Sequence, residues 1–190
     1  MNRCSWCGED PIYVKYHDDQ WGVPVYDDQE LFAKLILEGA QAGLSWITIL
    51  KKQEGYYRAF DGLVPEIMSN YKEEKIQKLI GDPGIVRNKL KIRAAVTNAQ
   101  AFLIIQKEKG SFSDYLWNFV GNEVITSNLK NKMEVRVTSP ESDAMSKDLE
   151  KKGFKFVGST ICYAFMQAVG MVNDHFTNCF RYEQIREIRR

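Results

Sequence analysis

Histidine is scarce in this chain, and each of its two histidines has a cysteine nearby, at opposite ends of the sequence. Cys4 precedes His17 by thirteen positions, and His175 precedes Cys179 by four. Residues four apart are neighbours on one face of a helix, so we expect His175 and Cys179 to share a helix face. Two cysteines and two histidines match the ligands of a tetrahedral zinc site in type and number. Such a site would join the two ends of the fold.

The same residues leave other interpretations open. Zinc-finger ligands are local in sequence, whereas these span the chain, so buried cysteines and hydrogen-bonded core histidines fit the pattern equally well. Cys4-x-x-Cys7 is also a metal-type or redox-type spacing, which leaves the choice between Cys4 and Cys7 open. A zinc ion with four protein ligands would stabilise the fold without activating water. The chemistry is therefore expected elsewhere in the chain.

Composition sets the class of protein but not its activity. The 190 residues suffice for one domain, or two packed lobes, with a substantial core, and the 44% hydrophobic content is typical of a globular protein. A formal net charge of +1 neither requires nor excludes nucleic acid, because a local basic face is enough. No apolar run is long enough for a membrane span or resembles a signal peptide, so we expect a cytoplasmic protein with reduced cysteines.

Helical periodicity runs through nearly the whole chain and predicts an all-α fold. Cap residues and Gly or Pro breaks divide the pattern into separate helices. The segment 122–140 lacks a helical period, with 135–138 compatible with an extended strand, and the basic tail 181–190 is expected to be solvated. The first predicted helices follow an Asp27 cap, cover 46–52 after Ser45, start at Pro65, and cover 72–80 and 87–109. Further helices are predicted over 114–117 after a Ser111 cap, over 142–152 after a Ser142 cap and over 159–170, with a last helical turn over 174–179.

The Gly/Pro turn Gly81–Gly84 joins two predicted helices, and the cations Arg87 and Lys89 follow it. The arrangement resembles a helix-hairpin-helix, a DNA-binding element without sequence specificity. Glycines let backbone N–H groups approach a phosphate, while the start of the next helix and nearby cations add attraction. A plain helix–helix turn beside a solvated basic face is the alternative that this pattern leaves open.

Glu38 interrupts a helix that is otherwise apolar at this point. Burying an unpaired carboxylate is costly, so Glu38 must face solvent or meet a cationic partner. A carboxylate among aromatic rings can hold a flat cationic ligand through stacking, cation–π attraction and charge-assisted hydrogen bonds. The alternative is a surface glutamate near core tryptophans. The nearby aromatic residues are Trp6, Tyr13, Tyr16, Trp21 and Trp46.

Taken together, these segments resemble the DNA-3-methyladenine glycosylase I family of helix-hairpin-helix proteins. The resemblance covers most of the chain except the segment 122–140 and the tail. The motifs that carry it are long, which makes it specific. The matching segments are Arg3–Cys4 with Trp6, Tyr16–Asp18, Trp21–Pro24, Leu37–Gly39, Gln41–Trp46, Phe154–Gly158, Thr160–Tyr163 and Val172–His175.

The resemblance implies a base-excision repair enzyme that flips an alkylated base out of double-stranded DNA and hydrolyses the N-glycosidic bond of 3-methyladenine. Glu38 and Tyr16 correspond to the family's contacts with the flipped base, and Trp46 corresponds to its stacking partner. The further residues that the resemblance assigns are Trp6 and Trp21 lining the pocket, Gly43 and Leu44 as an apolar wedge that offsets lost base stacking, and Gly84, Arg87 and Lys89 at the DNA backbone.

The resemblance also assigns a cofactor and a mechanism. The family's structural zinc set falls on Cys4, His17, His175 and Cys179, and no catalytic cofactor is expected. Many helix-hairpin-helix glycosylases carry a catalytic aspartate after the hairpin, but residues 85–113 contain no aspartate here. The 3-methyl group makes the adenine cationic, so the leaving group is already activated. Recognition of the base by Glu38 then suffices, with a general-base role left open, and we expect a monofunctional enzyme without a lyase step.

The domain prediction is a single monomeric glycosylase unit over 1–190. It divides into a hairpin-bearing lobe at about 28–140 and a zinc-clipped lobe made of 1–27 and 141–180. The expected partner is double-stranded DNA containing alkylated adenine. A zinc-stapled DNA-binding module without catalysis is the main alternative and would predict a disrupted pocket, whereas Tyr16, Glu38 and Trp46 are all present. A zinc hydrolase is a third possibility, against which four protein ligands argue.

Overall fold

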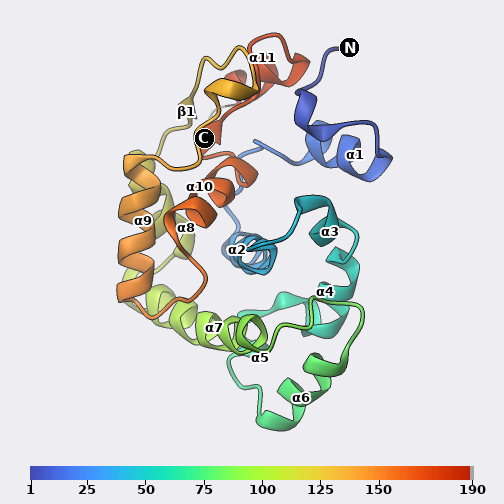
Figure 1. The fold of residues 1–190 in the computed structure, drawn as a ribbon. Helices are drawn as coiled ribbons and strands as arrows, with labels where there is room; N and C mark the ends of the chain where they lie inside the picture. The colour runs from blue at the N-terminus through green and yellow to red at the C-terminus, as the bar shows by residue number, and fades with distance from the viewer. Residues whose placement is uncertain (189–190) are drawn as a thin grey trace.

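The computed structural model describes residues 1–188 and is mostly helical (Figure 1). The fold-class prediction therefore holds in its main part, with one short pair of strands added. Arg189 and Arg190, the end of the predicted solvated tail, lie outside the described residues. The α-helices and strands are α1 (Pro11–Asp19), α2 (Asp28–Gln41), α3 (Trp46–Leu50), α4 (Gln53–Ala59), α5 (Pro65–Met68), α6 (Glu73–Gly81), α7 (Lys89–Lys109), α8 (Phe112–Trp117), β1 (Ile125–Thr126), α9 (Pro140–Lys151), α10 (Ser159–Ala168), β2 (Val172–Asn173) and α11 (Phe180–Glu187).

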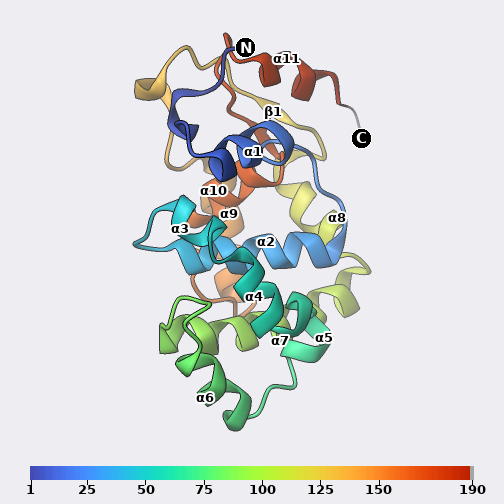
Figure 2. The same cartoon turned by 90° about the vertical axis from the view of Figure 1, so that its right-hand side faces the viewer.

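Helix α2 runs through the middle of the molecule, between α7 below and α10 above (Figures 1 and 2). The predicted cap is present, because the Asp27 carboxylate accepts a hydrogen bond from Glu30 N at 2.8 Å. The Asp28 carboxylate accepts from Phe112 N and Ser113 N, which ties the start of α2 to the start of α8. The apolar face of α2 lies inside the main hydrophobic core. The other end of α2 is therefore held at a fixed place, and it carries Glu38.

Helices α6 and α7 form the lower part of the molecule and meet at the predicted Gly/Pro turn (Figure 1). Asn88 caps α7 by accepting from Leu90 N and Lys91 N at 3.0 and 3.1 Å. The predicted helices after Ser45, at Pro65 and after Ser111 are also present, each within a few residues of its expected bounds. These boundaries follow from local cap chemistry.

The first residues of the chain and α11 lie close together at the top of the molecule (Figure 1). Strand β1 pairs with β2 in parallel, with Ile125 opposite Val172 and Thr126 opposite Asn173. Phe180 N donates a hydrogen bond to the Asn2 carbonyl at 3.0 Å. The pairing draws the segment after β1 toward the C-terminal residues.

The predicted helical turn over 174–179 is wrong. That stretch follows β2 as an extended and turning segment, and α11 begins only at Phe180. The Asn173 side chain accepts from His175 N at 3.3 Å, and Cys179 N bonds back to the Phe176 carbonyl. Strand pairing and these local bonds replace the helical hydrogen bonds. The residues 135–138, compatible with a strand in the sequence, contain no strand, and β1 lies earlier in the chain.

Three other local predictions need correction. Ser139, not Ser142, is the N-cap of α9, and Ser142 forms the other half of a capping box with it. Part of the tail that we expected to be solvated is helix α11, where Tyr182 and Ile185 are buried. Helices α1 and α4 were not among the predicted elements. Within residues 1–188, no helix combines the length and hydropathy needed to cross a membrane.

Candidate functional site

A buried cluster of cysteine and histidine joins the chain ends. The candidate ligand atoms of Cys4, His17, His175 and Cys179 all lie within 4.8 Å of one another, and all four residues are buried. Cys4 Sγ and Cys179 Sγ each lie 3.6 Å from His175 Nδ1, and Cys179 Sγ lies 3.5 Å from His17 Nε2. These residues come from three separate segments, so the cluster is a tertiary feature.

Cys7 is buried nearby but takes no part in the cluster. Its Sγ donates to the carbonyls of Cys4 and Gly8, at 3.2 and 3.8 Å. The Cys4 thiol, in contrast, lies 3.6 Å from His175 Nδ1. Cys162 is fully buried in α10, and burial raises its pKa to about 12. The geometry therefore favours Cys4 over Cys7 as a ligand.

The outward ring nitrogens of both histidines already have partners. His17 Nδ1 lies 2.8 Å from the Asp18 carboxylate, and His175 Nε2 lies 3.1 Å from the Trp21 carbonyl. Asp18 is held in turn by Arg3, whose hydrogen bonds are the main cause of its lowered pKa. Partners of this kind fix the ring orientation, and they leave one nitrogen of each histidine facing the two sulfurs. The donor set and its orientation fit a zinc ion.

The two cysteines of the cluster shift each other's pKa in opposite directions. Their mutual interaction is the largest cause in both, and it lowers the pKa of Cys179 and raises that of Cys4. The imidazoles of His17 and His175 lower the pKa of Cys179 further. Cysteine binds metals as the thiolate, and a lowered pKa favours that form.

A cleft of about 370 Å³ opens next to this cluster, between α1, α2, α3 and α10. It brings together the five residues that sequence analysis assigned to base binding. Four rings and one carboxylate from three separated segments therefore meet in one place. The residues concerned are Trp6, Tyr16, Trp21, Glu38 and Trp46.

Glu38 lies in the last turn of α2 and is only 2% exposed. The interpretation of Glu38 as a surface glutamate is therefore wrong. Burial raises the pKa of Glu38 to about 8, and the nearby Lys34 opposes this shift only in part. No group of the described chain donates a hydrogen bond to the Glu38 carboxylate. A buried Glu38 was expected to have a cationic partner, and Lys34 is the nearby cation. Glu38 thus combines a high cost of ionisation with free hydrogen-bonding capacity.

The aromatic rings form a continuous wall from the cleft to the cysteine and histidine cluster. Tyr16 and Trp46 have ring centroids 5.4 Å apart, and Trp6 and Trp21 have centroids 4.7 Å apart. Trp21 in turn meets His175 edge-on at 4.7 Å. Burial, together with the nearby Glu38 carboxylate, raises the pKa of Tyr16 well above its ordinary value. Its hydroxyl therefore keeps its proton at neutral pH.

The structure adds cleft residues that sequence analysis missed, and Asp174 is the clearest. Asp174 is 2% exposed, and its Oδ2 accepts from Tyr163 Oη at 2.9 Å and Gln167 Nε2 at 2.7 Å. Its Oδ1 is buried without a partner among the described residues. The signal was present, because Asp174 follows an apolar run and directly precedes His175. Tyr13, already named among the aromatic residues near Glu38, also lines the cleft. The other additions are Gln41, Ala164, Gln167, Phe176 and, from the segment 122–140, Lys132, Val135 and Val137.

The segment proposed as a wedge lies at the rim of the cleft. Gly43 and Leu44 occupy the turn between α2 and α3, and Leu44 is 41% exposed. Gly43 has a φ of +80°, which a residue with a side chain rarely adopts. Leu44 N bonds to the Gln41 carbonyl at 2.6 Å, which closes the turn. An apolar side chain is therefore held outward beside an aromatic cleft.

The turn between α6 and α7 is braced rather than open. Gly84 N donates to the Asp82 carboxylate at 2.7 Å, and Lys52 Nζ donates to the Pro83 carbonyl at 2.7 Å. A Cβ at Gly55 of α4 would overlap the Gly84 carbonyl, so the two backbones touch there. Arg87 and Lys89 are exposed just beyond this turn. The sequence-predicted phosphate contacts are thus presented at the surface on a fixed backbone.

Comparison with known proteins gives a consistent result. A family model for methyladenine glycosylases matches residues 6–182. The chain is 46% identical over 182 residues to DNA-3-methyladenine glycosylase 1 of Escherichia coli (strain K12), which covers 96% of this chain and 97% of that protein.

Solved structures agree with this match. The structure of 3-methyladenine DNA glycosylase I from Staphylococcus aureus, solved for its recognition of 3-methyladenine, is 37% identical with a TM-score of 0.93, covering 96% of this chain and 97% of that one. A single-residue variant of 3-methyladenine DNA glycosylase I in complex with 3-methyladenine is also 37% identical with a TM-score of 0.93, covering 96% and 98%.

Proposed function

The chain belongs to the methyladenine glycosylase family, and on this basis we propose that it excises 3-methyladenine from alkylated double-stranded DNA. The reaction is hydrolysis of the N-glycosidic bond, and it begins base-excision repair of the lesion. The observation that carries the proposal is the buried Glu38 carboxylate, unpaired within the described chain, in a cleft walled by aromatic rings.

Glu38 suits a cationic purine better than a neutral one. A buried carboxyl whose pKa is raised to about 8 gains most from a ligand that brings a positive charge or two donors. The amino edge of 3-methyladenine supplies hydrogen bonds, and its positive charge favours the ionised carboxylate. The Tyr16 hydroxyl gives a further contact, and Trp46 supplies a stacking surface, with Trp6 and Trp21 beyond. Neutral adenine lacks the charge and is bound less well.

The bond that breaks joins C1′ of the sugar to N9 of the methylated adenine. The electron pair of this bond goes to the base, which leaves as neutral 3-methyladenine, and the sugar becomes transiently cationic. A water molecule adds to C1′ and releases a proton to solvent. Because the leaving group is already charged, Glu38 acts by binding the departing base, and no enzyme amine takes part, so the enzyme is monofunctional.

Access to this cleft requires the base to leave the helix. Glu38 is buried below the surface, and a base stacked in duplex DNA cannot reach it. Leu44, with Gly43, is placed to enter the gap that the flipped nucleotide leaves. The turn ending at Gly84, with Arg87 and Lys89, acts as a helix-hairpin-helix that contacts the DNA backbone without reading sequence.

We infer that the cysteine and histidine cluster binds a structural zinc ion through Cys4, His17, His175 and Cys179. Support comes from the donor types, their mutual distances and the partners of both rings. Four protein ligands leave no position for water, so the ion would act as a cross-link between the chain ends. No catalytic cofactor is part of the proposal.

The chain is proposed to act as one monomeric unit with two packed lobes, the boundaries falling near residues 28 and 140. The main core runs from α2 to α10 and so crosses the boundary near residue 140, which means that the two lobes pack closely. A second small cluster around Cys4, Leu129, Phe176 and Cys179 lies with the chain ends. An enzyme of chromosomal DNA works where that DNA is, which in a bacterium is the cytoplasm.

The test is base release from methylated duplex DNA, with the free bases separated by chromatography. We expect the wild type to release 3-methyladenine selectively. Glu38→Gln is expected to lower the single-turnover rate by about 100-fold or more, because it removes the charge that balances the cationic base. Glu54→Gln, an exposed glutamate of α4, is the matched control and should behave as wild type.

The outcomes separate the competing functions. Tight DNA binding without base release by the wild type would identify a DNA-binding module without catalysis. Equal release by wild type and Glu38→Gln would keep the glycosylase assignment but remove Glu38 from its site. Release that stops on chelation while the fold persists would indicate zinc chemistry.

A further inference from the structure

The end of α2 poses a structural problem next to the cleft. The last carbonyls of any helix lack partners within the helix, and at this end the chain turns sharply through Ala42 and Gly43 into the exposed Leu44. The same helical turn carries Glu38. A group that binds these carbonyls therefore also determines the position of the exposed Leu44 side chain relative to the cleft.

Lys91 supplies the missing donors from another helix. Its Nζ donates to the Ala40 carbonyl at 2.8 Å and to the Ala42 carbonyl at 2.6 Å. These residues are about fifty positions away in sequence. A cation at the C-terminal end of a helix is also favoured by the helix dipole.

The charge of Lys91 is committed to these carbonyls. Among the described residues it forms no ion pair, and burial alone lowers its pKa. Nearby Arg93, two residues on, instead pairs with Glu73 at 2.6 Å. A half-buried lysine without a carboxylate partner is costly unless its hydrogen bonds do structural work.

Lys91 also lies in the first turn of α7, directly after the hairpin. Its own backbone N–H donates to the Asn88 cap, and the braced turn ending at Gly84 precedes it by only a few residues. The Lys91 side chain thus connects the turn ending at Gly84, which is proposed to contact the DNA backbone, to the segment that carries Leu44. These two proposed DNA-contacting regions otherwise belong to different segments.

We propose that Lys91 is a positioning residue, which holds the turn Ala42–Ser45 so that Leu44 enters the duplex when the hairpin is seated on the DNA backbone. This proposal rests on the proposed function, because it concerns the base-flipping step. Lys91 itself touches no base. Its loss should raise the cost of extruding a base and leave the cleft intact.

The experiment compares Lys91→Met with the wild type on two duplexes. In one the 3-methyladenine is paired with thymine, and in the other it faces an abasic site, where extrusion is easier. We expect a single-turnover rate at least about tenfold lower on the paired duplex, and a loss of about threefold or less on the other. Affinity for free 3-methyladenine, followed by tryptophan fluorescence, should stay within about twofold of the wild type.

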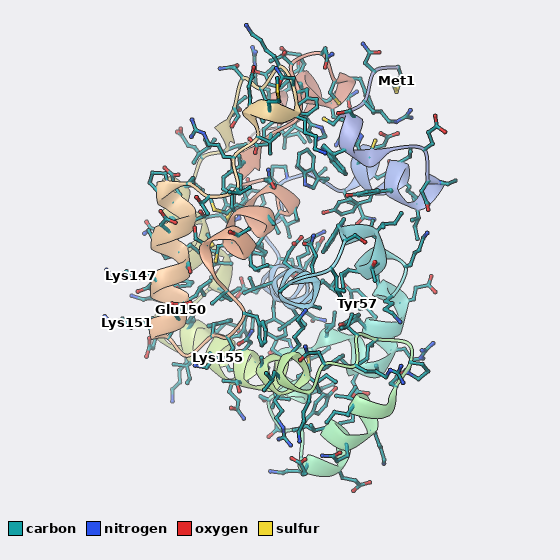
Figure 3. All side chains as sticks on the ribbon, viewed as in Figure 1. Met1, Tyr57, Lys147, Glu150, Lys151 and Lys155 are labelled. Carbon is teal, nitrogen blue, oxygen red and sulfur yellow. The ribbon has the colours of Figure 1, made fainter. Side chains whose placement is uncertain are left out.

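Three variants make the result specific. Lys91→Arg keeps two donors and should restore most of the rate. In a Leu44→Ala background, Lys91→Met should lower the rate little further, because the effects of two residues are not additive when one acts through the other. Lys147→Met removes an exposed lysine of α9, on the far side of the molecule from α3, and should have no effect (Figure 3).

A second readout keeps this proposal separable from the glycosylase assignment. A duplex with 2-aminopurine beside the lesion reports unstacking on saturating enzyme, and Lys91→Met should reduce that signal even if no base is released. Equal losses on both duplexes, full additivity with Leu44→Ala, or an unchanged 2-aminopurine signal would overturn the role of Lys91. Absence of base release by the wild type, with the signal intact, would instead overturn only the proposed activity.

Discussion

The cysteine and histidine cluster and the aromatic cleft adjoin each other, yet they treat their polar groups in opposite ways. In the cluster every ring nitrogen has a partner or faces a sulfur, and Asp18 and the Trp21 carbonyl fix both rings. In the cleft, Glu38 accepts no hydrogen bond from the described chain. The cluster holds its donor atoms in fixed positions close to one another, whereas the cleft keeps a carboxylate without a hydrogen-bond partner that a ligand can use.

This difference separates stability from function. Satisfied buried groups contribute to folding, whereas unsatisfied ones cost stability and gain it back on binding. The two sites also share a wall, since Trp21 contacts both Trp6 and His175. Damage to the cluster is therefore expected to spread to the cleft, while damage to the cleft should leave the cluster intact.

Metal removal should have the largest effect. If the cluster binds zinc, one equivalent should be found by elemental analysis, and its removal by a strong chelator should cost about 5 kcal/mol or more. The midpoint of thermal unfolding should then fall by more than about 10 °C. At temperatures below the new midpoint of unfolding, base release should fall only in proportion to the fraction of unfolded protein. A protein that unfolds at the same temperature with and without chelator would contradict a structural role.

Glu38 should make the fold less stable as pH rises. Its pKa is raised from 4.5 to about 8 in the folded chain, so between these values the unfolded chain has lost a proton that the folded chain keeps. Stability therefore falls from about pH 4.5 to about pH 8, and then levels off, by a few kcal/mol in all. Glu38→Gln should remove this part of the decline. Urea unfolding of both proteins across this range measures the difference, and parallel curves would show that Glu38 titrates normally.

Replacing Trp46 should have a smaller effect, confined to the affinity for the base. Replacing it with alanine removes one stacking surface, worth about 1–3 kcal/mol per base, so affinity for the lesion should drop roughly tenfold to a hundredfold. Trp46→Phe keeps a ring and should retain most of it. Titration of each variant with 3-methyladenine gives the affinities, and unfolding curves provide the control. An alanine variant that binds as the wild type does would place the base elsewhere in the cleft.

Replacing Cys7 should have the smallest effect. It provides a comparison with Cys4 within the same short motif. Because its thiol bonds to carbonyls and lies outside the cluster, Cys7→Ser should change stability by less than about 1 kcal/mol. Bound zinc should stay at one equivalent. Cys4→Ser, three residues away, should lose the metal. Loss of metal in Cys7→Ser would reverse the assignment of the two cysteines.

Much of the fold could be predicted because its signals are local. The caps at Asp27 and Ser111 and the glycine after Lys109 act through hydrogen bonds within a few residues, so they set helix ends wherever the helix lies. The error at Ser142 has the same origin, since Ser139 and Ser142 form one capping box and the pattern does not say which of them is the cap. The helical turn over 174–179 failed because strand pairing outweighed its local spacing.

The candidate site was predicted unevenly. Glu38 was recognisable because a carboxylate in an apolar helix is costly and so needs a reason. Lys132 gave no such signal, because the place of the segment that carries it depends on how β1 pairs with β2. The contact of Lys91 with α2 could not be foreseen either, since a surface lysine in sequence looks the same whether it faces water or carbonyls.

The sequence by itself determined the helical class, most helix boundaries, the family and the types of residue available for a metal and for a cationic base. Tertiary structure decided that Cys4 and not Cys7 faces His175, across 171 positions, that the segment after β1 lines the cleft, and that Lys91 binds the end of α2. The physical reason is range. Caps and periodicity act between neighbours, whereas a cluster or cleft exists only where distant segments pack within a few ångströms.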